Sequence, residues 1–166
     1  MPDSILITGG AGFIGSHAAE FYDDRGWKVT VVDNLSRKST LADTGEDRDT
    51  STYNWNYLSE HHPNVKLVEG DIRNGDRIMS LVEGHDAVIH TAGQVAVTSS
   101  LEDPITDFNV NIAGTINILE AAKHADSNPS VVFASTNKVY GDNINRIPIR
   151  ELDTRYCFDS EEFSNG

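Results

Sequence analysis

Short apolar runs alternate with amphipathic stretches along the first 135 residues of the chain. Each run is rich in β-branched residues and has few polar ones, which is typical of a strand that is buried on both faces of a sheet. Strands are therefore expected at residues 4–8, 28–33, 65–71, 86–93 and 130–135.

The stretches between these runs repeat apolar residues at the spacing of a helix. We expect helices at residues 13–26, near 55–60, at 75–84 and at 104–125. The last of them has a long apolar stripe, formed by Ile105, Phe108, Ile112, Ile116, Leu119 and Ala122. Strands and helices that alternate in this way predict an α/β fold with a Rossmann-like, doubly wound parallel sheet.

The alternation stops after Gly141. Residues 143–166 lack convincing periodicity, so we expect an irregular tail there and one α/β domain over residues 1–142. A chain of 166 residues suits a single domain. The pattern provides about five strands, and we expect the sheet to be truncated after the fifth.

Charge and cysteine content narrow the possible partners and the compartment. The chain has 26 acidic and 13 basic residues, a formal net charge of −13, which argues against nucleic acid and anionic membrane surfaces as partners. No apolar segment approaches the ~20 residues of a membrane span, and no secretory signal is expected. The single cysteine, Cys157, excludes an internal disulfide and fits a reducing cytosol, so a cytoplasmic protein is expected.

A glycine-rich loop follows the first expected strand directly. Gly9, Gly12 and Gly15 form the pattern GxxGxxG between a strand and a helix. Such a loop turns tightly, lets a diphosphate approach the main chain, and presents the amides of a helix N-terminus to the anion. Because a strand and a helix flank the pattern as required, it predicts a dinucleotide site.

Two acidic residues lie at the ends of the next two strands. Asp33 comes 18 residues after Gly15, near the ~20 expected for a carboxylate that binds the adenosine ribose. It favours NAD over NADP, although Arg37 and Lys38 are close enough in sequence to accept a 2′-phosphate. Asp71 is expected to accept a hydrogen bond from the adenine, with Ile72 beside the ring, or to cap the next helix, and the two roles are compatible.

Several motifs together resemble one family. The segments TGGAGFIG, Asp33-Asn34, Gly70-Asp71, HTAGQ, NVNIAGT and STNKVYGD occur in order. They are similar to those of the extended short-chain dehydrogenase/reductases, which are NAD-dependent nucleotide-sugar epimerases and dehydratases. The resemblance covers residues 3 to about 142. Within the family, the segments DNLSRK, GDIRN and GQVAVTSSLEDP are most similar to enzymes that epimerise C2 of a CDP-linked dideoxyhexose.

The resemblance implies a role for each matching position. Asn111 is expected to lie beside the cofactor, and Asn109, two residues earlier, is the alternative for that role. Ser100 is expected either to face the sugar or to cap the helix that starts at Pro104. Thr136 is expected to be catalytic, through a hydrogen bond to the hydroxyl that is oxidised. The implied cofactor-binding residues are Gly9, Gly12, Phe13, Ile14, Gly15, Asp33, Asn34, Asp71, Ile72, Ala92, Gly93, Gln94 and Asn111, and the implied substrate-binding residues are Ser100, Thr136 and Asn137.

The implied reaction removes a hydride from a sugar carbon to NAD and returns it to the other face; no metal is expected. In the family a tyrosine of a YxxxK pair is the base, but none of the five tyrosines here has a lysine four residues later. We therefore expect the cofactor-binding part of an epimerase, as a fragment, a split protein or a truncated product. The alternatives are a non-catalytic NAD-binding remnant and a related dehydratase or reductase. An exposed sheet edge is expected to favour a homodimer or another association.

Overall fold

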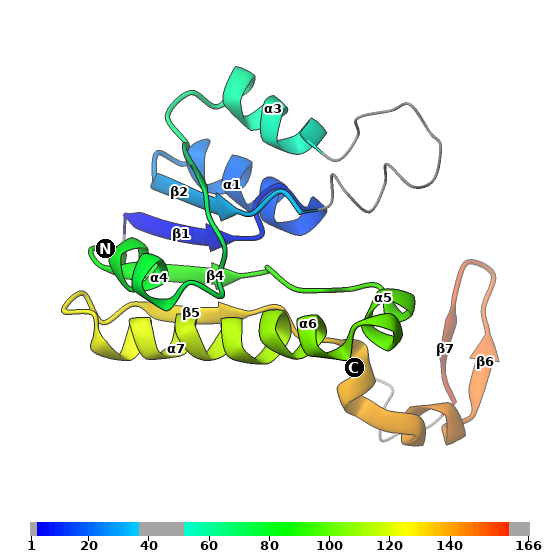
Figure 1. Ribbon diagram of the computed structural model, residues 1–166. Helices are drawn as coiled ribbons and strands as arrows, with labels where there is room; N and C mark the ends of the chain where they lie inside the picture. Colours follow the sequence, from blue (N-terminus) through cyan, green and yellow to red (C-terminus); the bar gives the residue numbers. More distant parts are fainter. Residues whose placement is uncertain (1–2, 37–51, 160–166) are drawn as a thin grey trace. The chain divides into compact units, whose positions relative to one another are not determined.

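The computed structural model describes residues 3–36 and 52–159, apart from the side chains of Asn137, Tyr140 and Ile144. The chain divides into two compact units, Met1–Ala134 and Ser135–Gly166 (Figure 1). The first unit therefore ends at the fifth strand, whereas the sequence pattern placed the end of the α/β domain after residue 142.

The first unit is built on a parallel sheet with the strand order β3-β2-β1-β4-β5. The chain adds β2 and β3 on one side of β1 and then β4 and β5 on the other side, which is the strand order of a Rossmann fold. It confirms the predicted doubly wound sheet, and the strand positions are close to those expected. The strands are β1 (Ser4–Thr8), β2 (Lys28–Asp33), β3 (Lys66–Glu69), β4 (Ala87–His90) and β5 (Ser130–Phe133).

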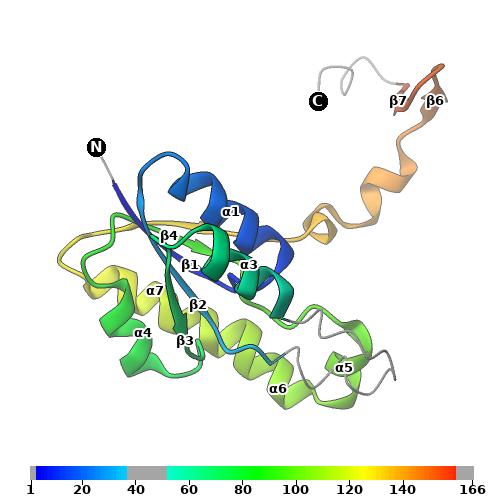
Figure 2. The same cartoon turned by 90° about the horizontal axis from the view of Figure 1, so that it is seen from above.

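Helices cover both faces of the sheet (Figure 2). Helices α1 (Phe13–Asp23) and α3 (Tyr53–His61) lie on one face, and α4 (Gly75–Val82) and α7 (Gly114–His124) lie on the other. His62, which ends α3, is joined to α1 through its Nδ1, 2.8 Å from Oδ2 of Asp23. No helix among residues 3–36 and 52–159 is long and apolar enough to cross a membrane.

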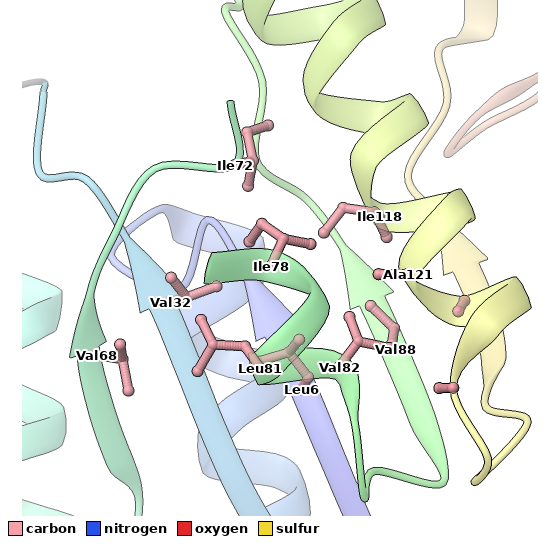
Figure 3. Packing of buried hydrophobic residues seen from close by; sticks show 12 residues of the cluster. Leu6, Val32, Val68, Ile72, Ile78, Leu81, Val82, Val88, Ile118 and Ala121 are labelled. Carbon is pink, nitrogen blue, oxygen red and sulfur yellow. The ribbon is translucent and has the colours of Figure 1, made fainter. Parts of the chain in front are cut away.

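Each face of the sheet has its own apolar core. On the α4/α7 face, Ile78 and Ile118 pack with Leu6 and Val88 and are all fully buried (Figure 3). On the other face, Leu58 of α3 packs against the strands with Ile5, Ile7 and Val31. Full burial of such a side chain stabilises the fold by about 1.5–3 kcal/mol.

The long helix expected at residues 104–125 is interrupted. Helix α5 (Val97–Glu102) precedes α6 (Pro104–Phe108), and a π-helical turn (Asn109–Ala113) joins α6 to α7. Most of the apolar stripe of this helix is exposed, and the opposite side packs on the sheet. There a Cβ on Gly114 would lie 2.5 Å from Cδ1 and 2.7 Å from Cγ1 of Ile72, so a larger residue would have to displace the Ile72 side chain. The exposed members of the stripe are Ile105, Phe108, Ile112, Ile116 and Leu119.

The second unit contains short elements that the sequence pattern did not indicate. A 3₁₀ segment (Asn137–Arg146) is followed by an antiparallel hairpin of β6 (Ile149–Glu151) and β7 (Tyr156–Phe158). Strands of three residues are too short for an alternating pattern to identify. Nε of Arg150 lies 3.2 Å from Sγ of Cys157 across this hairpin.

Candidate functional site

The glycine loop fills the space between the ends of β1, β2 and β4. Gly9 has φ 73°, a conformation that favours glycine. A Cβ on Gly9 would lie 2.6 Å from the main-chain nitrogen of Ala92, and one on Gly15 would lie 2.4 Å from the carbonyl oxygen of Gly9. The fold itself therefore requires both glycines. Gly12 differs, because among the described residues a Cβ there would meet only the carbonyl oxygen of Gly9, at 3.1 Å.

Helix α1 begins immediately after this loop with no capping side chain. Its N-cap is Gly12, which has extended backbone angles, and no acidic residue lies in the first turn. The first amides of any α-helix lack intrahelical acceptors and lie at the positive end of its dipole. The side chains of Phe13 and Ile14 in the first turn are 72% and 62% exposed. This combination suits a bound anion.

Asp33 ties the end of β2 to the glycine loop. Its Oδ2 accepts a hydrogen bond from the Ala11 amide at 3.0 Å, and its Oδ1 accepts one from the Leu35 amide at 2.8 Å. Each carboxylate oxygen has a second lone pair, which a ribose hydroxyl could use. Arg37 and Lys38, the candidates for a 2′-phosphate, lie outside the described residues.

Asp71 lies at the end of β3 and is joined to β2 through Asn34, whose Nδ2 donates to Oδ2 of Asp71 at 2.9 Å. Arg73 donates to both oxygens of the same carboxylate, from Nε at 2.9 Å and from Nη2 at 2.6 Å. The hydrogen bonds from Arg73 are the main reason that the pKa of Asp71 is lowered to about 2, against the opposing effect of burial; Asn34 lowers it further.

The alternative role of Asp71 as a helix cap is wrong. Asn74 caps α4, with its Oδ1 accepting from the Arg77 amide at 3.1 Å. Ile72 is only 6% exposed and packs in the core, so little of its side chain is available to a ligand.

Asn111 connects the π-helical turn to the loop after β4. Its Oδ1 accepts from the Gln94 amide at 2.8 Å, and its Nδ2 donates to the Gln94 carbonyl at 3.1 Å. Gly93 is in close contact with the same side chain, since a Cβ on Gly93 would be 3.1 Å from Oδ1 of Asn111. Gly93 and Gln94 thus lie against Asn111, and this contact favours Asn111 over Asn109 as the residue beside the site.

Ser100 lies within α5 and does not cap the following helix. The cap of α6 is Asp103, whose Oδ1 accepts from the Thr106 amide at 3.0 Å. Oγ of Ser100 lies 2.7 Å from Oδ1 of Asp107, and Asp107 also accepts from Nδ2 of Asn111 at 3.0 Å. Asp107, which the sequence did not single out, therefore links the predicted substrate residue Ser100 to the predicted cofactor residue Asn111.

Two further residues at the site were not anticipated. Nδ2 of Asn54 in α3 donates to the carbonyl of Ala11 in the glycine loop at 3.2 Å, and Arg73 neutralises Asp71. No motif marks Asn54, because it lies in a polar segment that carries no pattern. Thr136 and Asn137 belong to the second unit, so their roles stay predictions.

Comparison with known proteins agrees with this geometry. A family model described as "NAD dependent epimerase/dehydratase family" matches residues 5–161. The chain is 42% identical over 158 residues to a CDP-paratose 2-epimerase of Salmonella typhi, covering 93% of the chain and 43% of that protein. It is 35% identical over 148 residues to a putative UDP-glucose 4-epimerase of Methanocaldococcus jannaschii, covering 89% and 42%.

Solved structures give the same result. The UDP-glucose 4-epimerase of Brucella ovis, in complex with NAD, has a TM-score of 0.63 and 31% identity, over 84% of this chain and 37% of that one. The Thermus thermophilus UDP-glucose 4-epimerase, also in complex with NAD, has a TM-score of 0.60 and 33% identity, over 80% and 37%. The chain thus spans less than half the length of these relatives. It belongs to the NAD-dependent epimerase/dehydratase family.

Proposed function

We propose that this chain is the NAD-binding part of a nucleotide-sugar epimerase. The observation that carries the proposal is the uncapped start of α1 at Gly12. Packing explains the absence of a side chain at Gly9 and Gly15, but within residues 3–36 and 52–159 the only close contact of a Cβ at Gly12 is one carbonyl oxygen at 3.1 Å. A diphosphate that binds to the first amides of α1 would explain why Gly12 has no side chain.

The residues around the loop fit the rest of such a cofactor. Asp33 would accept hydrogen bonds from ribose hydroxyls, and Asn34 with Asp71 would lie toward the adenine. Ala92, Gly93, Gln94 and Asn111 would line the other half of the molecule. NAD, when bound, supplies the hydride acceptor and donor, while the protein binds and orients it.

A CDP-linked dideoxyhexose is the substrate that we favour. The similarity to a CDP-paratose 2-epimerase supports it, while other relatives bear the names of UDP-sugar 4-epimerases. Ser100, Thr136 and Asn137 would face the sugar, with Thr136 on the hydroxyl that is oxidised. Because no tyrosine of these 166 residues is followed by lysine four positions later, we expect them to bind NAD without epimerising a sugar alone. A dehydratase or reductase of the same family is the alternative. We infer a cytoplasmic location from the single cysteine, which fits a reducing compartment.

Substitution of Gly12 tests the cofactor proposal. Gly12→Ala is expected to weaken NAD binding about 10- to 100-fold, the value of one or two charge-assisted hydrogen bonds, because the methyl group keeps the diphosphate from the amides. Isothermal titration calorimetry measures the affinity, and thermal unfolding is expected to change little, since a shift of a few tenths of an ångström relieves the single contact. Wild-type protein that does not bind NAD, or unchanged affinity in Gly12→Ala, contradicts the proposal.

We also propose that the chain self-associates through the outer side of β5 and the exposed stripe of α6 and α7. Among the described residues β5 has a neighbouring strand on one side only, and Val132 and Phe133 of β5 are exposed. Unpaired edges and large apolar patches of this kind favour association.

Ile116→Glu is expected to convert a dimer into a monomer, because it places a charge in the middle of the stripe. Light scattering coupled to size-exclusion chromatography measures the mass. Phe21→Glu is the matched control, since Phe21 is an exposed apolar residue of α1, which lies on the opposite face of the sheet. A monomeric wild type, or a dimer that survives Ile116→Glu, contradicts the proposed interface.

A further inference from the structure

A line of hydrogen bonds crosses the interior of the first unit just beneath the glycine loop. Oγ1 of Thr8, the last residue of β1, lies 2.6 Å from Nδ1 of His90, the last residue of β4. Nε2 of His90 lies 3.0 Å from Oγ1 of Thr115 in α7. Oγ1 of Thr115 donates to the carbonyl oxygen of Asn111 at 2.7 Å.

The chemistry of the groups fixes the direction of this line. The carbonyl of Asn111 only accepts, so the hydroxyl hydrogen of Thr115 is directed to it. The Thr115 oxygen must then accept from His90, which places the imidazole proton on Nε2. Burial lowers the pKa of His90 to about 4, so the ring is neutral at ordinary pH and Nδ1 is an acceptor.

With Nδ1 as an acceptor, Thr8 donates to it, and the Thr8 oxygen accepts from the amide of Ala92 at 3.3 Å. Every polar atom of the line thereby has a partner. The same line reaches all three segments that are expected to touch the cofactor: Gly9 follows Thr8 in the chain, Ala92 is bonded to Thr8, and Asn111 holds Gln94.

We propose that His90 is a positioning residue of the dinucleotide site, which sets the glycine loop, the turn after β4 and the π-helical turn in register with one another. The inference rests on the proposed function. Packing alone does not require an imidazole at this position. His90 is 1% exposed, and a leucine of similar size would bring no polar atoms of its own that need partners there. The histidine provides what an apolar residue cannot, which is an acceptor toward β1 and a donor toward α7.

Thr115→Val is the sharpest test, because it removes the end of the line and keeps the side-chain shape. We expect NAD affinity to fall about five- to tenfold, the value of roughly one hydrogen bond. Asn111 would then hold Gln94 less firmly, and hydrogen exchange of the Gln94 amide is expected to become about tenfold faster. Exchange is measured by NMR and affinity by calorimetry. Long-range ¹H–¹⁵N spectra of the wild type are expected to show the proton of His90 on Nε2.

Thr30→Val is the matched control. Thr30 is also buried, and its Oγ1 lies 3.0 Å from Nε2 of another histidine, His85, near the opposite end of β4. The same chemical change there breaks a threonine–histidine bond that does not reach the loops, so NAD affinity and Gln94 exchange are expected to stay unchanged.

The outcomes separate the positioning role from the cofactor assignment. If Thr115→Val and Thr30→Val alter NAD affinity and Gln94 exchange equally, or if neither variant alters them, the positioning role is wrong. A His90 proton found on Nδ1 also overturns it. If wild-type protein does not bind NAD, the proposed function fails, while the exchange rate of Gln94 and the imidazole spectrum still decide whether the line holds the turn.

Discussion

Gly9→Ala is expected to lower the free energy of unfolding by roughly 2–5 kcal/mol and to abolish NAD binding. Two costs add together in this variant. The left-handed conformation, with φ 73°, costs about 1–2 kcal/mol for any residue with a Cβ. The new methyl group would also lie 2.6 Å from the amide nitrogen of Ala92, a main-chain atom that cannot move without displacing β4. Overpacking of this kind costs about 1–3 kcal/mol.

Gly26→Ala separates the two costs. Gly26 has nearly the same backbone conformation, with φ 76°, but a Cβ there would meet nothing within 4 Å. The Gly26→Ala variant is therefore expected to lose only about 1–2 kcal/mol, from the strained backbone alone. Chemical denaturation measures the free energy of unfolding of both variants. The difference between the two losses is the cost of the contact between the new methyl group and the main chain of Ala92, which follows β4. Equal losses in the two variants contradict the close contact of Gly9 with the end of β4.

The sheet could be predicted from the sequence because its strands are buried on both faces. Continuous β-branched runs such as Ser4–Thr8 and Lys28–Asp33 have no other stable place in a domain of this size. The exposed stripe of α6 and α7 shows where this argument fails. Apolar spacing identifies a helix but does not say which side faces the sheet, and here the side with Gly114 and Ala121 fits closely against it while Ile116 is exposed.

Residues of the candidate site could be predicted from the sequence where a glycine shapes the main chain or where a polar residue stands at the end of a strand. Gly9, Gly12 and Asp33 occupy such positions. The capping roles were predicted wrongly because nearer residues compete for them. Asp103 stands directly before Pro104, the usual arrangement of an N-cap before a proline, and Asn74 stands directly before α4. The contact of Asn111 with Gln94 depends on the π-helical turn, and periodicity cannot reveal a single extra residue in a helix.

Protein stability is expected to fall as the pH is lowered from 6.5 to 4, and His90 is expected to account for roughly 2–3 kcal/mol of that loss. Burial lowers the pKa of His90 from 6.5 to about 4 in the folded protein. Below pH 6.5 the unfolded chain therefore binds a proton that the folded protein does not, so acid favours unfolding. The loss levels off below pH 4, where the folded protein also binds the proton.

The contribution of His90 is isolated by comparing wild type with His90→Gln, which retains a polar side chain that can both donate and accept. Free energies of unfolding at pH 7 and pH 4.5 are measured by urea denaturation, and the variant is expected to lose less stability between them than the wild type does. Burial also lowers the pKa of His85, which acts in the same direction, but it is present in both proteins and cancels in the difference. Asp71 does not interfere, because its carboxylate, with a pKa of about 2, loses its stabilising effect only below pH 3.8. An equal loss in the two proteins would mean that His90 takes up its proton as readily in the folded chain as in the unfolded one, which a neutral ring donating from Nε2 to Thr115 does not allow.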